Sequence, residues 1–203
     1  MILTSATSPA CCGSARTVIE PPRRVAQRFA DYLNSVLNRT VSDARLTLLP
    51  IPGQDTHYNL ACVEGGERVP FALHGVTELL FVRQAVEVVN DHCQTVSYAY
   101  RYQSGEEKSS WLLRWEYFRE RPRPDYEFPL AHVHANAELV DPTTTAARLN
   151  KPAWHLHIPT ARVPLELVIW HVIAEWGVVP KTDDWRELLG ESLEGFEHRR
   201  RAP

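Results

Sequence analysis

Residues 95–102, TVSYAYRY, and residues 111–118, WLLRWEYF, decide the fold of this 203-residue chain. In the first segment tyrosines alternate with small or polar residues, which is the period-2 pattern of a β-strand. A Ser-Gly pair provides a turn before the second segment. That segment alternates as well, with Arg114 and Glu116 on one face and three aromatic residues on the other. We therefore predict an antiparallel hairpin whose two faces differ in polarity.

Two further segments downstream of the hairpin carry closely spaced histidines. We predict strands over residues 131–138 and 154–158, because both segments alternate between apolar and polar residues. Side chains two positions apart on a strand share a face and lie roughly 6.7 Å apart along the chain. Each segment thus presents its polar side chains together, and these are His132, His134, Asn136 and Glu138 in the first and His155 and His157 in the second.

The rest of the chain predicts helices around a sheet. Helical spacing of apolar residues favours helices over 22–38, 77–90, 141–149 and 164–176, and one more near the C-terminus. Shorter strands are expected over 45–49, 57–63 and 69–73. This order predicts an α+β fold with a mainly antiparallel sheet of about five or six strands and helices packed on one face. We expect residues 1–20 to be a flexible tail and residues 21–203 to form a single domain.

The composition limits the cellular compartments and the kinds of partner that we expect for this chain. The formal net charge is −3, so any site for a nucleic acid must be small and local. The first residues lack the basic start and apolar core of a signal peptide, and no run of about 18 apolar residues is present for a membrane span. The four cysteines form no Cys-x-x-Cys pair. We expect a cytoplasmic protein with reduced thiols and no membrane partner.

The histidine segments allow three interpretations. In the first, His132 and His134 act as proton donor and acceptor without a metal, Arg114 stabilises charge on a phosphate, and Glu116 orients an imidazole. Further substrate contacts would come from His155, His157 and Asn136. In the second, a divalent transition metal is held by His132, His134 and Glu138, whose spacing matches the first cupin motif. In the third, these residues are the solvated polar face of a half-buried sheet.

The segment Leu113–Glu116, followed by FPLAHVH at residues 128–134, resembles a core pattern of the TumE-like toxins of bacterial toxin–antitoxin modules. The resemblance covers residues 95–138, about a third of the chain. It implies a growth-inhibiting endoribonuclease that acts on RNA and is neutralised by an antitoxin, usually a helix-turn-helix protein. This chain is longer than that pattern, has Glu116 where aspartate is common, and adds residues 155–160 and two C-terminal helices.

Our leading prediction is therefore a toxin-type, metal-independent endoribonuclease with no cofactor. The alternatives are a metal-dependent cupin-like enzyme and a non-catalytic protein that binds a partner through its last two helices. A homodimer is compatible with all three.

Overall fold

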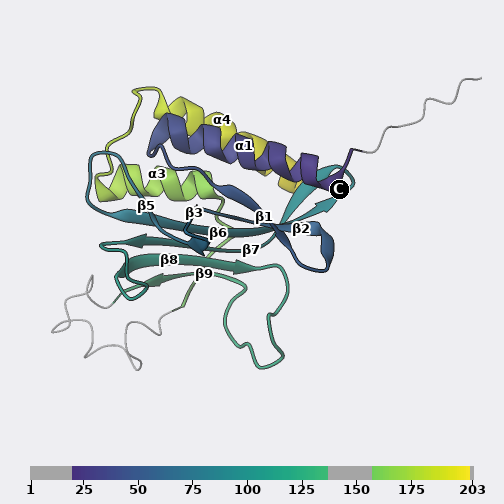
Figure 1. The fold of residues 1–203 in the computed structure, drawn as a ribbon. Helices are drawn as coiled ribbons and strands as arrows, with labels where there is room; N and C mark the ends of the chain where they lie inside the picture. Colours follow the sequence, from purple (N-terminus) through teal and green to yellow (C-terminus); the bar gives the residue numbers. More distant parts are fainter. Residues whose placement is uncertain (1–19, 137–156, 202–203) are drawn as a thin grey trace, which may run out of the picture.

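The computed structural model describes residues 20–136 and 157–201 of the chain. Three helices lie together on one side of a large sheet (Figure 1). The helices are α1 (Pro22–Thr40), α3 (Leu165–Trp176) and α4 (Trp185–Arg201). The strands are β1 (Thr47–Ile51), β2 (Gln54–Ala61), β3 (Val63–Glu64), β4 (Glu67–Arg68), β5 (Phe71–Ala72), β6 (Leu79–Val89), β7 (His92–Gln103), β8 (Trp111–Phe118), β9 (Ala131–Ala135) and β10 (Ile158–Pro159).

The main sheet is antiparallel throughout its described strands. Its order is β1-β2-β6-β7-β8-β9-β10, with β5 paired to β6, while β3 and β4 form a separate two-stranded sheet. The predicted α+β class with helices on one face is confirmed, and the β7–β8 hairpin lies near the centre of the sheet. Within residues 20–136 and 157–201 the sheet has eight strands, more than the five or six expected.

The predicted helix over residues 77–90 is wrong. This segment is β6, which pairs with β7 over its whole length. Its even-numbered residues from Leu80 to Val88 are buried, whereas Arg83, Ala85 and Glu87 on the other face are only partly buried. That is the period of a strand, and four valines favour extended backbone because their branched side chains are restricted in helices. The predicted helix over residues 141–149 lies outside the described residues.

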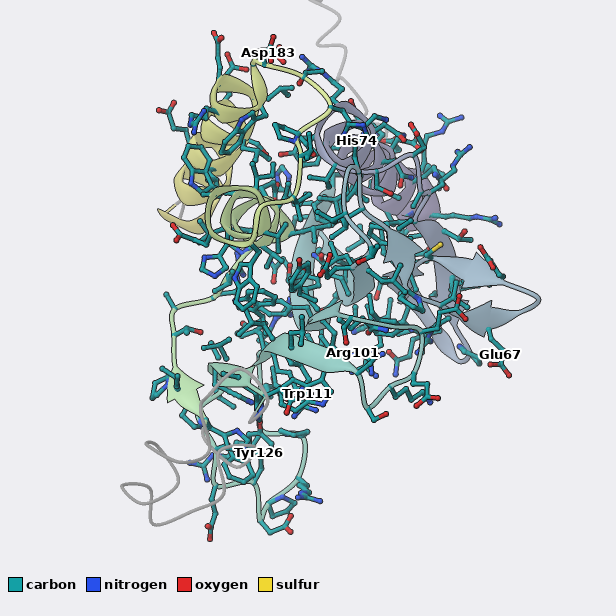
Figure 2. The ribbon with its side chains drawn as sticks, turned by 90° about the vertical axis from the view of Figure 1, so that its left-hand side faces the viewer. Glu67, His74, Arg101, Trp111, Tyr126 and Asp183 are labelled. Atoms are coloured by element: carbon teal, nitrogen blue, oxygen red, sulfur yellow. The ribbon has the colours of Figure 1, made fainter. Side chains whose placement is uncertain are left out.

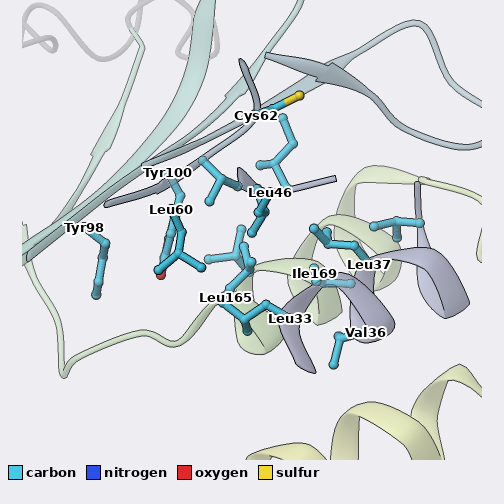
Figure 3. Packing of buried hydrophobic residues seen from close by; sticks show 14 of the residues in the cluster. Leu33, Val36, Leu37, Leu46, Leu60, Cys62, Tyr98, Tyr100, Leu165 and Ile169 are labelled. Atoms are coloured by element: carbon cyan, nitrogen blue, oxygen red, sulfur yellow. The ribbon is translucent and has the colours of Figure 1, made fainter. Parts of the chain in front are cut away.

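The hydrophobic core fills the space between the helices and one face of the sheet (Figure 3). Leu33 and Leu37 from α1 meet Ile169 from α3 and Leu60 from β2 in this layer. The alternate tyrosines of β7 enter the same layer and are almost completely buried. Tyr100 donates a hydrogen bond of 2.7 Å to Gln84 Oε1, so its hydroxyl group keeps a partner inside the core. The tyrosines of β7 and Trp115 of β8 thus belong to the core, and the polar face of the hairpin points away from the helices. Trp111 was predicted on the core side, but the register shifts between Tyr102 and Gln103 and places Trp111 beside Arg114 and His134.

Both end strands of the sheet path, as far as the described residues show it, contain a proline. Pro50 lies in β1 and Pro159 in β10, and β10 pairs with β9 through two residues only. Proline has no N–H group to donate, so each of these strands has a gap in its row of backbone donors.

A close packing contact joins the turn between β5 and β6 to the segment after α3. Gly75 has φ +73°, and a Cβ atom there would lie 2.5 Å from the side chain of Val179. Gly75→Ala therefore both strains the backbone and overfills the contact, and we expect it to lower the free energy of unfolding by about 2–4 kcal/mol. Urea unfolding measures this. Combining it with Val179→Ala should recover part of the loss, and no recovery would contradict the packing argument.

None of the described helices combines the length and the apolar character that a membrane crossing requires.

Candidate functional site

The polar face of the hairpin continues across three strands, β7, β8 and β9. Arg101 on β7 is paired with Arg114 on β8, which is paired with His134 on β9. Two residues further along β8, Glu116 is paired with His132 on β9. Because directly opposed side chains of paired strands lie on the same face, these residues form one surface on the side of the sheet opposite the helices. Arg101 lies on this side in Figure 2.

His132 is held in one orientation by the backbone. Its Nδ1–H donates a hydrogen bond of 2.6 Å to the carbonyl oxygen of Pro129, in the turn that leads into β9. The other ring nitrogen, Nε2, lies 3.4 Å from Glu116 Oε2. The nitrogen is thus close to the carboxylate, but it has no aligned hydrogen-bond partner within the described chain. The ring is only 1% exposed.

Glu116 is the centre of the cluster. Its Oε2 lies 3.2 Å from His134 Nε2 and 3.4 Å from Arg114 Nη2. The same Arg114 nitrogen lies 3.2 Å from His134 Nε2. His134 Nε2 therefore faces a carboxylate that can only accept a hydrogen bond and a guanidinium that can only donate one. The other ring nitrogen of His134, Nδ1, is buried without a partner among the described residues.

His157 completes the cluster from the residue just before β10. Its ring stacks on Phe128 with 3.7 Å between centroids. It also lies 4.1 Å from the His134 ring and 4.8 Å from the His132 ring, again measured between centroids. One ring nitrogen from each of the three histidines lies within 4.8 Å of those of the other two. The approach of His157 to His132 and His134 could not be predicted from the sequence, because the sequence does not reveal which strands are neighbours.

Burial and neighbouring charges shift several pKa values. Burial opposes ionisation of Glu116, but the contacts with His132 and His134 and the charge of Arg114 outweigh it, so the carboxyl pKa lies well below its ordinary value. Burial also lowers the pKa of His134, although its contact with Glu116 acts in the opposite direction. Burial and then the neighbouring imidazoles lower the pKa of His157 to about 4. At neutral pH the site thus contains a carboxylate and neutral imidazoles at positions 134 and 157.

These shifts predict a loss of stability in acid. Below pH 6.5 the unfolded chain takes up a proton at His157, whereas the folded chain does not do so until about pH 4. The free energy of unfolding should therefore fall as the pH is lowered from 6.5 to 4, and the depressed pKa of Glu116 adds to the loss at the acid end. Urea unfolding at several pH values measures the slope. His157→Gln should flatten it, and an unchanged slope in that variant would contradict the assignment.

The remaining predicted site residues divide into two groups. Asn136 directly follows β9 and donates a hydrogen bond of 2.6 Å to the carbonyl oxygen of Trp111, which ties the end of β9 to β8. His155 and Glu138 lie outside the described residues, so the predicted metal set with Glu138 stays a prediction. Of the histidines in the second segment, His157 is the one that the described structure brings to the cluster.

A cationic groove beside the cluster was not predicted from the sequence. It has a volume of about 450 Å³ and runs across the outer face of the sheet. Arg101 lies in it with its guanidinium 3.9 Å above the ring of Phe81. The missed signal was in β6, whose assignment to a helix hid the alternation that places Phe81 and Arg83 on this face. The groove is lined by Glu67, Arg68, Phe81, Arg83, Ala99, Arg101, Lys108, Arg114 and Glu116.

Comparisons of the chain with protein-family models, curated proteins and solved structures gave no match.

Proposed function

We propose that the outer face of the sheet binds and cleaves RNA. The observation that carries this proposal is the continuity of the cationic groove with the imidazole cluster, because Arg114 and Glu116 belong to both. The weakly negative net charge is compatible with it, since five positively charged side chains but only two carboxylates line this groove.

The charge in the groove favours a polyanion. Burial and then the nearby charges of Arg114 and Arg83 lower the pKa of Arg101, which means that these guanidinium groups repel one another in the free protein. A phosphate group placed between them would relieve that repulsion. Guanidinium groups bind phosphate oxygens through pairs of N–H donors, and the side chains of Arg101 and Arg114 both line the groove.

The adjoining cluster contains the groups that RNA cleavage requires. In this reaction the ribose 2′-hydroxyl attacks the neighbouring phosphorus, the bond to the 5′-oxygen breaks, and a 2′,3′-cyclic phosphate and a 5′-hydroxyl end are formed. In our proposal the neutral, partly exposed imidazole of His157 accepts the hydroxyl proton, water supplies the proton that the departing 5′-oxygen takes up, and the pentacoordinate phosphate needs a cation. Arg114 supplies the cation.

The burial of the two β9 histidines limits what they can touch. His132 and His134 are each 1% exposed, whereas Glu116 and His157 are partly exposed. A bulky substrate therefore meets Glu116, Arg114 and His157 first. In our proposal His132 and His134 act through Glu116, whose position and charge they control.

The test uses a single-stranded RNA oligonucleotide and the purified chain. We expect cleavage that leaves a 2′,3′-cyclic phosphate, and no cleavage of the same sequence with 2′-deoxyribose throughout. Mass spectrometry of the products distinguishes the ends. The absence of cleavage of any RNA, together with no RNA binding at low salt, would exclude the proposal.

The resemblance to TumE-like toxins suggests a protein partner for the proposed ribonuclease. We propose that the cleavage activity inhibits growth and that an antitoxin, expected to be a helix-turn-helix protein, neutralises it. The supporting observation is the site itself, since Arg114, Glu116, His132 and His134 of the matching segment converge. Expression in bacteria should slow growth, and co-expression of the protein encoded next to it should restore growth. Normal growth at a high level of the folded chain would remove the toxin role.

A further inference from the structure

We infer that His132, His134 and His157 form a binding site for one divalent transition-metal ion. The inference goes beyond RNA cleavage, because it concerns what the free protein binds. It also changes the metal set expected from sequence by bringing in His157.

The first observation is three ring nitrogens without partners. His132 Nε2, His134 Nδ1 and His157 Nδ1 are all buried and have no hydrogen-bond partner within the described chain. A buried polar atom without a partner costs roughly 1–3 kcal/mol, so three in one cluster need an explanation. A metal ion provides one, since neutral imidazole nitrogens are common ligands of zinc and related ions.

The second observation is that each ring is already held in position by another contact. His132 donates its opposite nitrogen to a backbone carbonyl, and His134 places its opposite nitrogen 3.2 Å from the Glu116 carboxylate. These are the two kinds of group that usually orient metal-bound histidines from behind. His157 is held by its stack on Phe128. The three rings are thus oriented without use of the partnerless nitrogens.

The distances suit one ion after a small adjustment. One nitrogen from each ring lies within 4.8 Å of the others, and a metal–nitrogen bond of roughly 2.0–2.1 Å requires the three to approach a little more closely. His157 is only partly buried and precedes the two-residue β10, so it has the most freedom to move. Three protein ligands leave a fourth position open, which is the arrangement of catalytic zinc sites.

The surrounding charges are compatible with a cation. Glu116 lies beside two of the three histidines and carries a negative charge, because its pKa is held low. Arg114 contacts His134 at Nε2, the nitrogen on the opposite side of the ring from the partnerless Nδ1. The guanidinium charge is therefore separated from the ion by the imidazole ring.

A bound ion would also change the chemistry of the proposed RNA site. With the imidazole lone pairs occupied, the acceptor of the 2′-hydroxyl proton becomes a metal-bound hydroxide. We then expect cleavage to be lost after removal of metal and restored by adding it back. Metal binding is measured without RNA, so the two proposals can fail separately. If the chain binds metal but does not cleave RNA, only the proposed function is excluded. If it cleaves RNA but binds no metal, only the metal site is excluded, and the nuclease is metal-independent.

The binding experiment uses the full chain freed of metal with a chelator. Titration with Zn²⁺ in a calorimeter should show one ion bound per chain, and the midpoint of thermal unfolding should rise with Zn²⁺ concentration. With Co²⁺ the visible absorption spectrum should show the intense bands of a four-coordinate site. His157→Gln should weaken Zn²⁺ binding by at least about 100-fold, and Glu116→Gln by about 10–100-fold.

The matched control is His92→Gln, which removes an exposed histidine at the β6–β7 turn. It should bind Zn²⁺ as the wild-type chain does. His157 lies at the edge of the sheet, so its variant should stay folded, and circular dichroism checks this. No stoichiometric binding by the wild-type chain, or equal binding by the folded His157→Gln variant, would overturn the inference.

Discussion

Replacing His132 and His134 together by glutamine is expected to lower the rate of RNA cleavage by at least about 1,000-fold. Both rings hold the Glu116 carboxylate in place and pack against His157, so their loss misplaces the groups that meet the substrate, and a misplaced acid–base group loses its contribution of about 10²–10⁴ to the rate. Under the metal inference the same change removes two of three ligands. Either mechanism thus predicts loss of activity, and the two are separated by measuring bound Zn²⁺ in the same variant.

The difficulty with this variant is that both side chains are buried. A glutamine side chain can still donate to the Pro129 carbonyl, which an alanine cannot, and thermal unfolding shows whether the fold survives. His157→Gln at the partly exposed third position provides a milder test and should also reduce cleavage. The control is again His92→Gln, with unchanged activity. Full cleavage by a folded double variant would remove both histidines from the mechanism.

Tyr100→Ala is expected to lower the free energy of unfolding by about 3–5 kcal/mol, which is typical of a large aromatic residue removed from a core. Tyr100 is 1% exposed and stacks on Tyr98 with 4.5 Å between ring centroids. Its loss would also leave Gln84 without the hydroxyl group that donates to it. Such a loss is a large part of the total stability of a domain.

Replacing Arg101, the next residue on the same strand, should affect RNA binding more than stability. Arg101 points to the outer face, so Arg101→Ala should cost no more than about 1 kcal/mol of stability, mainly through the lost contact with Phe81. It should weaken RNA binding and reduce the slope of log affinity against log salt by about 0.7, as expected for one lost contact with a single-stranded backbone. Urea unfolding and binding titrations at several salt concentrations measure both effects. Equal destabilisation by the two variants would contradict the assignment of the faces.

Sequence patterning succeeded where one face of a strand is buried and the other is not. The tyrosines of β7 and the polar residues of β8 and β9 alternate strictly, so the hairpin and the shared face of His132 and His134 could be predicted. The same reasoning failed for β6, because Phe81 and Ala85 make its outer face partly apolar and blur the alternation. A short apolar segment of this kind is ambiguous until its pairing partner is known.

The composition of the site depended on information that the sequence does not contain. Which strands are neighbours decides that His157 meets His134, and the loop before β9 decides that Phe128 stacks on His157. The near-complete burial of His132 was also unexpected, because alternation only predicted that its face was polar. Local patterns show which side chains share a face, whereas strand order and loop conformation decide what covers them.

The prolines in β1 and β10 bear on how copies of this chain can associate. An unprotected outer strand can pair with a strand of another molecule, which leads to intermolecular sheets and aggregates. Pro50 and Pro159 each interrupt the hydrogen bonding that such pairing needs. A homodimer would therefore be expected to form through side-chain contacts on the helical layer or the outer face, and not by joining two sheets end to end. The same interruptions should keep partly unfolded chains from adding to one another during synthesis.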